Sequence, residues 1–100
     1  MSFNKRILSA GAADLVASEN FKVVTYTGNG GTQSINVGFQ PDFVWIKQRN
    51  ATNHSRLLDS TRGATKILYS SLGYAEDTES TGLTAFTSTG FNLGAQQSVN

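Results

Sequence analysis

The hydrophobic pattern is densest in the run FVWIKQR, which begins at Phe43. Aromatic and β-branched residues favour strands, and the side chains of an extended strand point alternately to its two faces. Pro41, the only proline, fixes its own φ angle and biases the preceding residue toward an extended conformation, so it predicts a turn just before this run. We therefore expect the central strand of a β-domain here, with Trp45, the only tryptophan, buried in its core.

The same alternation, or a short apolar run between turn residues, predicts further strands along the chain. They cover residues 21–27, 35–37, 54–60, 66–70, 83–87 and 91–93. The glycine-rich stretch at residues 28–31 is typical of a hairpin turn, because neither a helix start nor a Lys-Ser/Thr pair follows it as in a phosphate-binding loop. The acidic stretch at residues 73–82 has little hydrophobic support and predicts a long surface loop.

Composition agrees with a single all-β domain. The chain has 100 residues, of which 38% are hydrophobic and 15% charged, enough for one domain with a modest core. A formal net charge of +1 argues against a general nucleic-acid-binding protein. The absence of cysteine excludes disulfides and thiolate metal sites. No apolar run reaches the roughly 18 residues of a membrane span, so membrane insertion is not expected.

Residues 1–20 differ in character from the rest and are expected to form an N-terminal arm, with the β-domain at residues 21–100. Asp14 and the weakly apolar residues before it argue against a signal peptide. Two interpretations of this irregular or partly helical arm remain open. It is either a free arm with a helical turn near residues 12–18, or an anchoring arm that becomes ordered on a neighbouring subunit.

The densest cluster of functional groups is His54, Arg56, Asp59 and Arg62. Its order and spacing match no nucleophile elbow, and the chain has no G-x-S-x-G motif, so we expect no catalytic residue and no enzyme. The cluster instead predicts a structural turn. Asp59 accepts backbone N–H groups further along, Arg62 pairs with its carboxylate or with a nearby carbonyl, and Gly63 adopts a positive φ angle.

Neither a metal ion nor a cofactor is expected. One histidine and scattered carboxylates cannot supply a compact site for a first-row transition metal. Asp77 and Glu79 are a weak candidate for calcium, but Ca²⁺ takes six or more oxygen ligands and the spacing fits no known loop. A solvated acidic loop is the simpler interpretation.

Carbohydrate binding stays open as an alternative function. Lectin sites combine an exposed aromatic ring with amide and acidic side chains on loops, and the chain is rich in both. Trp45 would be the natural stacking platform, although its place within a strand favours the core. Contacts with a ligand or partner are expected instead at Tyr26, Tyr69, Tyr74, Asn53 and His54.

Three motifs occur in a fixed order: GFQPDFVWIKQR, HSRLLDSTRG and LTAFTSTGFNLG. Together they resemble a domain of virion proteins from marine tailed bacteriophages, especially those that infect cyanobacteria, over about residues 21–94. The resemblance implies an antiparallel β-sandwich of jelly-roll or concanavalin-like type. It also implies a structural protein of the phage particle, in a tail fibre, tail-associated or displayed on the surface, with a role in assembly or host attachment. Remote alternatives are a capsid decoration protein and a hydrolase.

The same resemblance sets the expected partners and location. The domain is expected in the virion, assembled in the host cytoplasm, beside other virion proteins and in contact with a host-surface glycan. Similar proteins carry a further aromatic-rich strand after the last motif, whereas this sequence ends at Asn100. It is therefore expected to be a reduced member, a fragment, or a domain whose sheet is completed by something else, with an open edge within residues 83–94. Such an edge favours a homo-oligomer, a trimer if the protein belongs to a fibre, or addition of a strand from a neighbouring virion protein.

Overall fold

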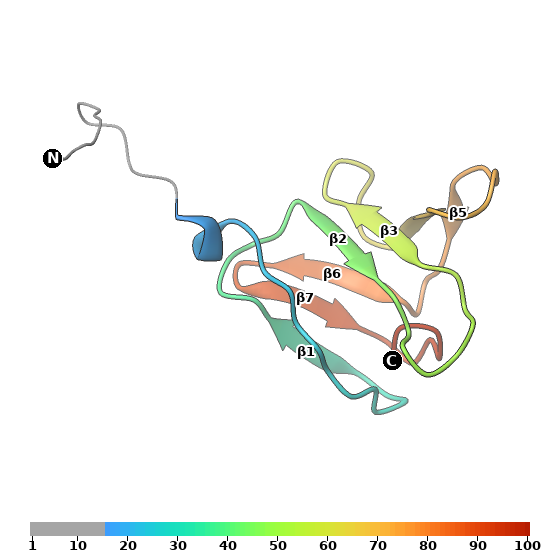
Figure 1. The fold of residues 1–100 in the computed structure, drawn as a ribbon, viewed down its shortest axis with the longest axis horizontal. Helices are drawn as coiled ribbons and strands as arrows, with labels where there is room; N and C mark the ends of the chain where they lie inside the picture. Colours follow the sequence, from blue (N-terminus) through green and yellow to red (C-terminus); the bar gives the residue numbers. More distant parts are fainter. Residues whose placement is uncertain (1–15) are drawn as a thin grey trace, which may run out of the picture.

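The computed structural model describes residues 16–100, which form two antiparallel β-sheets (Figure 1). One sheet has three strands in the order β1-β7-β6, and the other has four in the order β2-β3-β4-β5. The elements are the 3-10 helix η1 (Ala17–Glu19) and the strands β1 (Gln33–Asn36), β2 (Phe43–Ile46), β3 (Arg56–Asp59), β4 (Lys66–Tyr69), β5 (Asp77–Thr78), β6 (Leu83–Thr87) and β7 (Gly90–Leu93). The predicted all-β class and antiparallel sandwich are confirmed.

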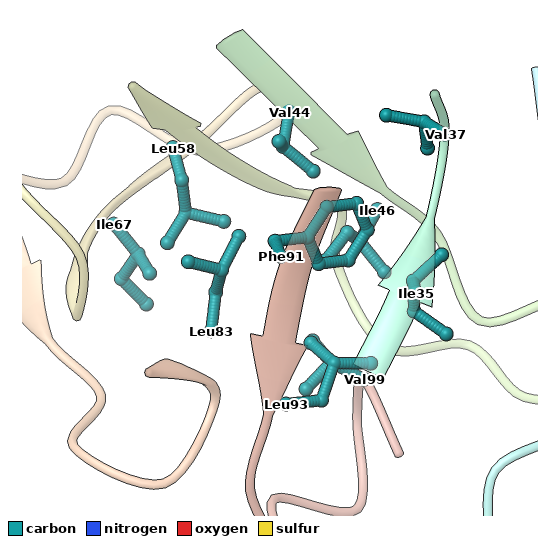
Figure 2. Packing of buried hydrophobic residues seen from close by; sticks show 10 residues of the cluster. All are labelled: Ile35, Val37, Val44, Ile46, Leu58, Ile67, Leu83, Phe91, Leu93 and Val99. Atoms are coloured by element: carbon teal, nitrogen blue, oxygen red, sulfur yellow. The ribbon is translucent and has the colours of Figure 1, made fainter. Parts of the chain in front are cut away.

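The core consists of side chains from the inner faces of both sheets, together with Val37 and Val99, which lie outside the strands (Figure 2). Leu58 and Ile67 from the four-stranded sheet and Leu83 and Leu93 from the three-stranded sheet are each only 1% exposed. Such side chains contribute most of the burial that stabilises a small domain. The cluster comprises Ile35, Val37, Val44, Ile46, Leu58, Ile67, Leu83, Phe91, Leu93 and Val99.

The connection between β1 and β2 carries the chain from one sheet to the other. Gly38 adopts a φ angle of 89° in this connection, which glycine tolerates without strain. Pro41 is buried just before β2, so the predicted turn lies where the chain changes sheets.

The predicted strand at residues 21–27 is wrong as an element of a sheet. The segment belongs to neither sheet of the described chain, although its side chains still alternate in burial. Val24 and Tyr26 pack against the core, whereas Phe21 and Val23 are 73% and 80% exposed. The local pattern is that of a strand, but pairing also requires a neighbouring backbone in register, which this segment lacks within residues 16–100.

Two other expectations need adjustment. The stretch at residues 73–82 is not entirely a loop, because β5 lies within it and pairs with β4. Residues 83–94 do not form one open edge, because β7 lies between β1 and β6. The predictions for residues 1–15 lie outside the described residues. The described part of the arm contains η1, and the domain boundary at residue 20 stays a prediction.

Candidate binding surface beside strand β2

Trp45 lies on the protein surface, so its predicted place in the core is wrong. The predicted central position of its strand is also wrong, because β2 is an edge strand of the four-stranded sheet. The Trp45 side chain is 62% exposed, and Phe43, two residues earlier on the same face, is 57% exposed. Val44 and Ile46 occupy the inner face of β2 and are 8% and 7% exposed. The alternation was correctly predicted, but the aromatic face points to solvent.

The aromatic face of β2 continues across the outer surface of the four-stranded sheet. Trp45 is the register partner of Leu57 on β3, and Leu57 is the partner of Leu68 on β4. Both leucines are only partly buried. Residues directly opposite each other in antiparallel strands have neighbouring side chains, so these three side chains form an apolar stripe across three strands.

Within residues 16–100, the outer edge of β2 also presents backbone groups without a hydrogen-bond partner. The Ser60 N–H donates to the Asp42 carbonyl over 2.9 Å, so Asp42 and Ser60 form a hydrogen-bonded pair. In antiparallel strands every second pair is hydrogen-bonded, so the next such pairs are Val44 with Leu58 and Ile46 with Arg56. Val44 and Ile46 therefore direct their N–H and C=O groups toward β3. Phe43 and Trp45 direct theirs toward the free edge.

A cleft of about 600 Å³ runs along this edge. The extended segment at residues 20–26 lines one side and β2 lines the other, and the cleft reaches the core residues Ile35 and Phe91. Its charged lining residues are Lys22, Asp42 and Lys47. Mostly apolar walls with a few polar groups, and a volume in this range, are typical of ligand-binding clefts.

A second aromatic cluster brings together Tyr69, Tyr74 and His54, which were predicted as contact residues. The Tyr69 ring centroid lies 6.2 Å from that of His54 and 5.9 Å from that of Tyr74, both edge to face. The Arg56 guanidinium carbon lies 5.1 Å from the Tyr69 ring centroid. Tyr74 is 66% exposed, so part of this cluster is accessible to a partner.

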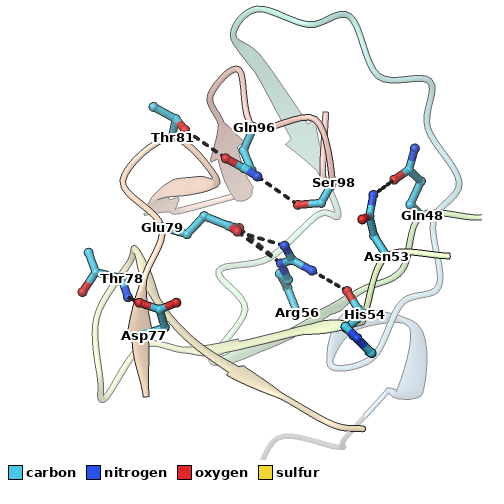
Figure 3. Close-up of polar contacts among 10 residues, drawn as sticks. All are labelled: Gln48, Asn53, His54, Arg56, Asp77, Thr78, Glu79, Thr81, Gln96 and Ser98. Atoms are coloured by element: carbon cyan, nitrogen blue, oxygen red, sulfur yellow. Dashed lines mark hydrogen bonds and ion pairs between the residues drawn. The ribbon is translucent and has the colours of Figure 1, made fainter. Parts of the chain in front are cut away.

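The other two predicted contact residues lie elsewhere. The Tyr26 hydroxyl donates to the Val99 carbonyl over 2.6 Å, and burial raises the pKa of this phenol above its ordinary value. The Asn53 Nδ2 donates to the Gln48 Oε1 over 2.5 Å (Figure 3). Tyr26 therefore supports the packing of the extended segment rather than an exposed contact.

The predicted turn contains the expected contacts. The Arg62 backbone N–H donates to Asp59 Oδ1 over 2.7 Å, and Arg62 Nε donates to Asp59 Oδ2 over 2.9 Å. The Gly63 N–H donates to the Asp59 carbonyl, and Gly63 has a φ angle of 98°. How much this turn stabilises the domain stays a prediction.

The family comparison covers the whole described domain. Residues 16–100 match the family described as a domain of unknown function, DUF7483. The chain belongs to this family. No curated protein and no solved structure matches it. The function of this DUF7483 domain therefore has to be argued from its surface.

Within residues 16–100, the DUF7483 domain has no group of three or more His, Cys, Asp or Glu side chains that could hold a metal ion. The described residues also contain no helix long and apolar enough to cross a membrane.

The exposed aromatic residues Phe21 and Phe43 were missed in the sequence. One signal was present for Phe43, because Lys47 and Arg49 share its face of the alternating run whereas the Val44 face carries no charge.

Proposed function

We propose that this DUF7483 domain is a non-catalytic binding module of a bacteriophage particle. Its place would be a tail fibre, another tail component or the particle surface, where it takes part in assembly or host attachment. The phage assignment is supported by the three motifs and their order. The binding role is supported by one observation above all: Phe43 and Trp45 are exposed side by side on the outer face of β2.

Exposed aromatic residues of this kind favour a binding role. Large apolar side chains that stay exposed gain little stability from folding, and contiguous apolar patches on soluble proteins usually mark interaction sites. Tryptophan and other aromatic residues also contribute disproportionately to the affinity of protein interfaces. The proposed partners are other virion proteins, which would cover this face in the assembled particle.

The arrangement of polar side chains favours binding over hydrolysis. His54 Nδ1 lies 2.8 Å from Ser71 Oγ, which resembles part of a nucleophile–base pair. The His54 ring otherwise packs edge to face on Tyr69. The Asp59 carboxylate, five residues further along the chain, binds the Arg62 backbone and side chain. A triad needs an acid that orients the histidine, and Asp59 is engaged elsewhere.

Carbohydrate binding is the second candidate, and the exposure of Trp45 favours it. An accessible indole ring on a rigid strand can stack on a sugar, and the polar groups of Asp42 and Gln40 line the same cleft. The ligand would be a glycan of the host surface.

Two experiments test these functions. Gold-labelled antibodies against the domain should decorate intact particles of the encoding phage at a defined position, and particles that lack the protein would contradict the virion assignment.

A glycan array should show binding that is lost in Trp45→Ala and retained in Tyr74→Ala if the second candidate is correct. Equal binding by wild type and Trp45→Ala would contradict a glycan site at Trp45.

A further inference from the structure

We propose that two copies of this chain pair antiparallel along the free edges of their β2 strands. The pairing would join two four-stranded sheets into one continuous sheet. It involves the Phe43 and Trp45 rings of the proposed binding face, but it is tested on the isolated chain and can hold or fail independently of the proposed function.

The backbone of β2 is prepared for such pairing. Its Phe43 and Trp45 N–H and C=O groups point away from β3, as the alternation beginning at Asp42 and Ser60 requires. The cleft of about 600 Å³ beside this edge gives an incoming strand space to approach it. An unpaired edge of this kind readily accepts another strand.

The register follows from symmetry. In a two-fold pairing centred on Val44, Phe43 of one copy lies opposite Trp45 of the other. Both residues direct their backbone groups toward the free edge, so each opposed pair exchanges both hydrogen bonds and the two pairs together form about four. A two-fold axis at Phe43 or at Trp45 would also pair residues whose backbone groups face the free edge. It would pair Phe43 with Phe43 or Trp45 with Trp45, and the other aromatic residue would then lack an aromatic partner.

The side chains support the same register. With Val44 at the centre, the Phe43 ring of each copy lies beside the Trp45 ring of the other on the outer face of the joined sheet. Such aromatic pairs across neighbouring strands are mutually stabilising. β2 contains no charged residue and no proline, the two features that most often prevent edge pairing.

The other outer edges fit a second copy less well. β5 has only two residues, one of them Asp77, and short charged edges resist pairing. On β6, the Leu83 carbonyl already accepts the Thr65 N–H over 3.0 Å. β1, the other edge of the three-stranded sheet, has the sequence QSIN and exposes no apolar side chain. The edge of β2 is therefore the favoured site for a second copy.

The exposed area suggests a dimer of moderate affinity. Phe21, Val23, Phe43 and Trp45 are between 57% and 80% exposed. Together they present on the order of 500 Å² of largely apolar surface, against roughly 800 Å² for each partner in a typical stable interface. We therefore expect reversible association with a dissociation constant of roughly micromolar order.

Amide hydrogen exchange of the full chain, measured by NMR across a concentration series, tests the pairing at single residues. The Val44 and Ile46 amides should be protected at every concentration because they bond to β3. The Phe43 and Trp45 amides should exchange rapidly in dilute samples and about ten-fold or more slowly once the dimer forms. Sedimentation equilibrium on the same samples should show a monomer–dimer equilibrium.

Two variants distinguish the contribution of the Phe43 backbone N–H to dimerisation from that of the Phe43 ring. Phe43→Pro removes an N–H that faces the free edge and leaves the bonds to β3 in place, so it should remain monomeric. Phe43→Ala keeps that N–H and should dimerise more weakly than wild type. A monomeric wild type at a concentration on the order of 1 mM would overturn the proposal. A trimer would also overturn it, as would a dimer in which the Phe43 and Trp45 amides exchange as fast as in dilute samples. The exchange measurement on wild type decides the question even if Phe43→Pro fails to fold.

Discussion

Arg56 and Glu79 form an ion pair in the interior of the domain, with Arg56 Nη2 3.1 Å from Glu79 Oε2 (Figure 3). Their side chains are only 10% and 11% exposed. Arg56 Nη1 also donates to the His54 carbonyl over 2.6 Å, and the Glu79 N–H donates to the Thr65 carbonyl. The pair thus connects β3 to the segment that follows β5.

Loss of one member of this pair should strongly destabilise the domain. Glu79→Ala leaves the Arg56 charge buried without its partner, and we expect the free energy of unfolding to fall by about 3–5 kcal/mol. The double variant Arg56→Met/Glu79→Leu, which removes both charges, should recover much of this loss. Urea denaturation measures both. A double variant as unstable as Glu79→Ala would contradict the electrostatic explanation.

The turn at Asp59 and Arg62 should contribute less. The two side chains are 28% and 42% exposed, so their ion pair is expected to add only about 0.2–1 kcal/mol. Asp59→Ala also removes the acceptor of the Arg62 N–H and should cost about 1–2 kcal/mol in all. A double-mutant cycle with Arg62→Ala measures the coupling, and zero coupling would show that the ion pair adds nothing.

Tyr26 should make the domain sensitive to alkaline pH. Its folded-state pKa is raised by burial, so above the ordinary phenol value of about 10 the unfolded state loses its proton before the folded state does. The free energy of unfolding should therefore decrease as pH rises through the interval between the two pKa values. In Tyr26→Phe this alkaline decrease in the free energy of unfolding should disappear, whereas Tyr74→Phe should retain it. The same alkaline decrease in Tyr26→Phe would assign the effect to another group.

Gly90 should tolerate no side chain. A Cβ atom there would lie 1.8 Å from the Ile35 carbonyl oxygen, where β7 packs closely against β1. Since the obstacle is backbone, Gly90→Ala should cost several kcal/mol or prevent folding. Gly73→Ala is the matched control, because nothing lies within 4 Å of its added Cβ. Thermal unfolding of the two variants provides the comparison, and equal melting temperatures would contradict this packing.

The sequence predicted those features that depend on neighbouring residues. Alternation located the strands around Val44, Leu58, Ile67 and Phe91, because burial of one face requires that period. The contacts between Asp59 and Arg62 were also foreseen, since they join residues three apart along the chain.

Features that depend on distant parts of the chain were not predictable in this way. Residues 21–27 have the composition of a strand, but pairing depends on which backbone lies beside them. Within β2 both faces are apolar, and only Lys47 and Arg49 beyond the strand favour exposure of the Trp45 face. The burial of Val44 follows from the position of the second sheet. The pairing of Arg56 with Glu79 joins two residues that are far apart in sequence and that local patterns cannot relate.

The central claim is that the aromatic face of β2 serves binding and not the stability of the fold. The most direct test is the free energy of unfolding of Trp45→Ala in a dilute, monomeric sample, with Leu58→Ala as the reference for a buried residue. We expect Trp45→Ala to change this free energy by less than about 1 kcal/mol, and Leu58→Ala to lower it by about 2–5 kcal/mol. A loss of about 3–5 kcal/mol in Trp45→Ala, as for a core tryptophan, would contradict the claim.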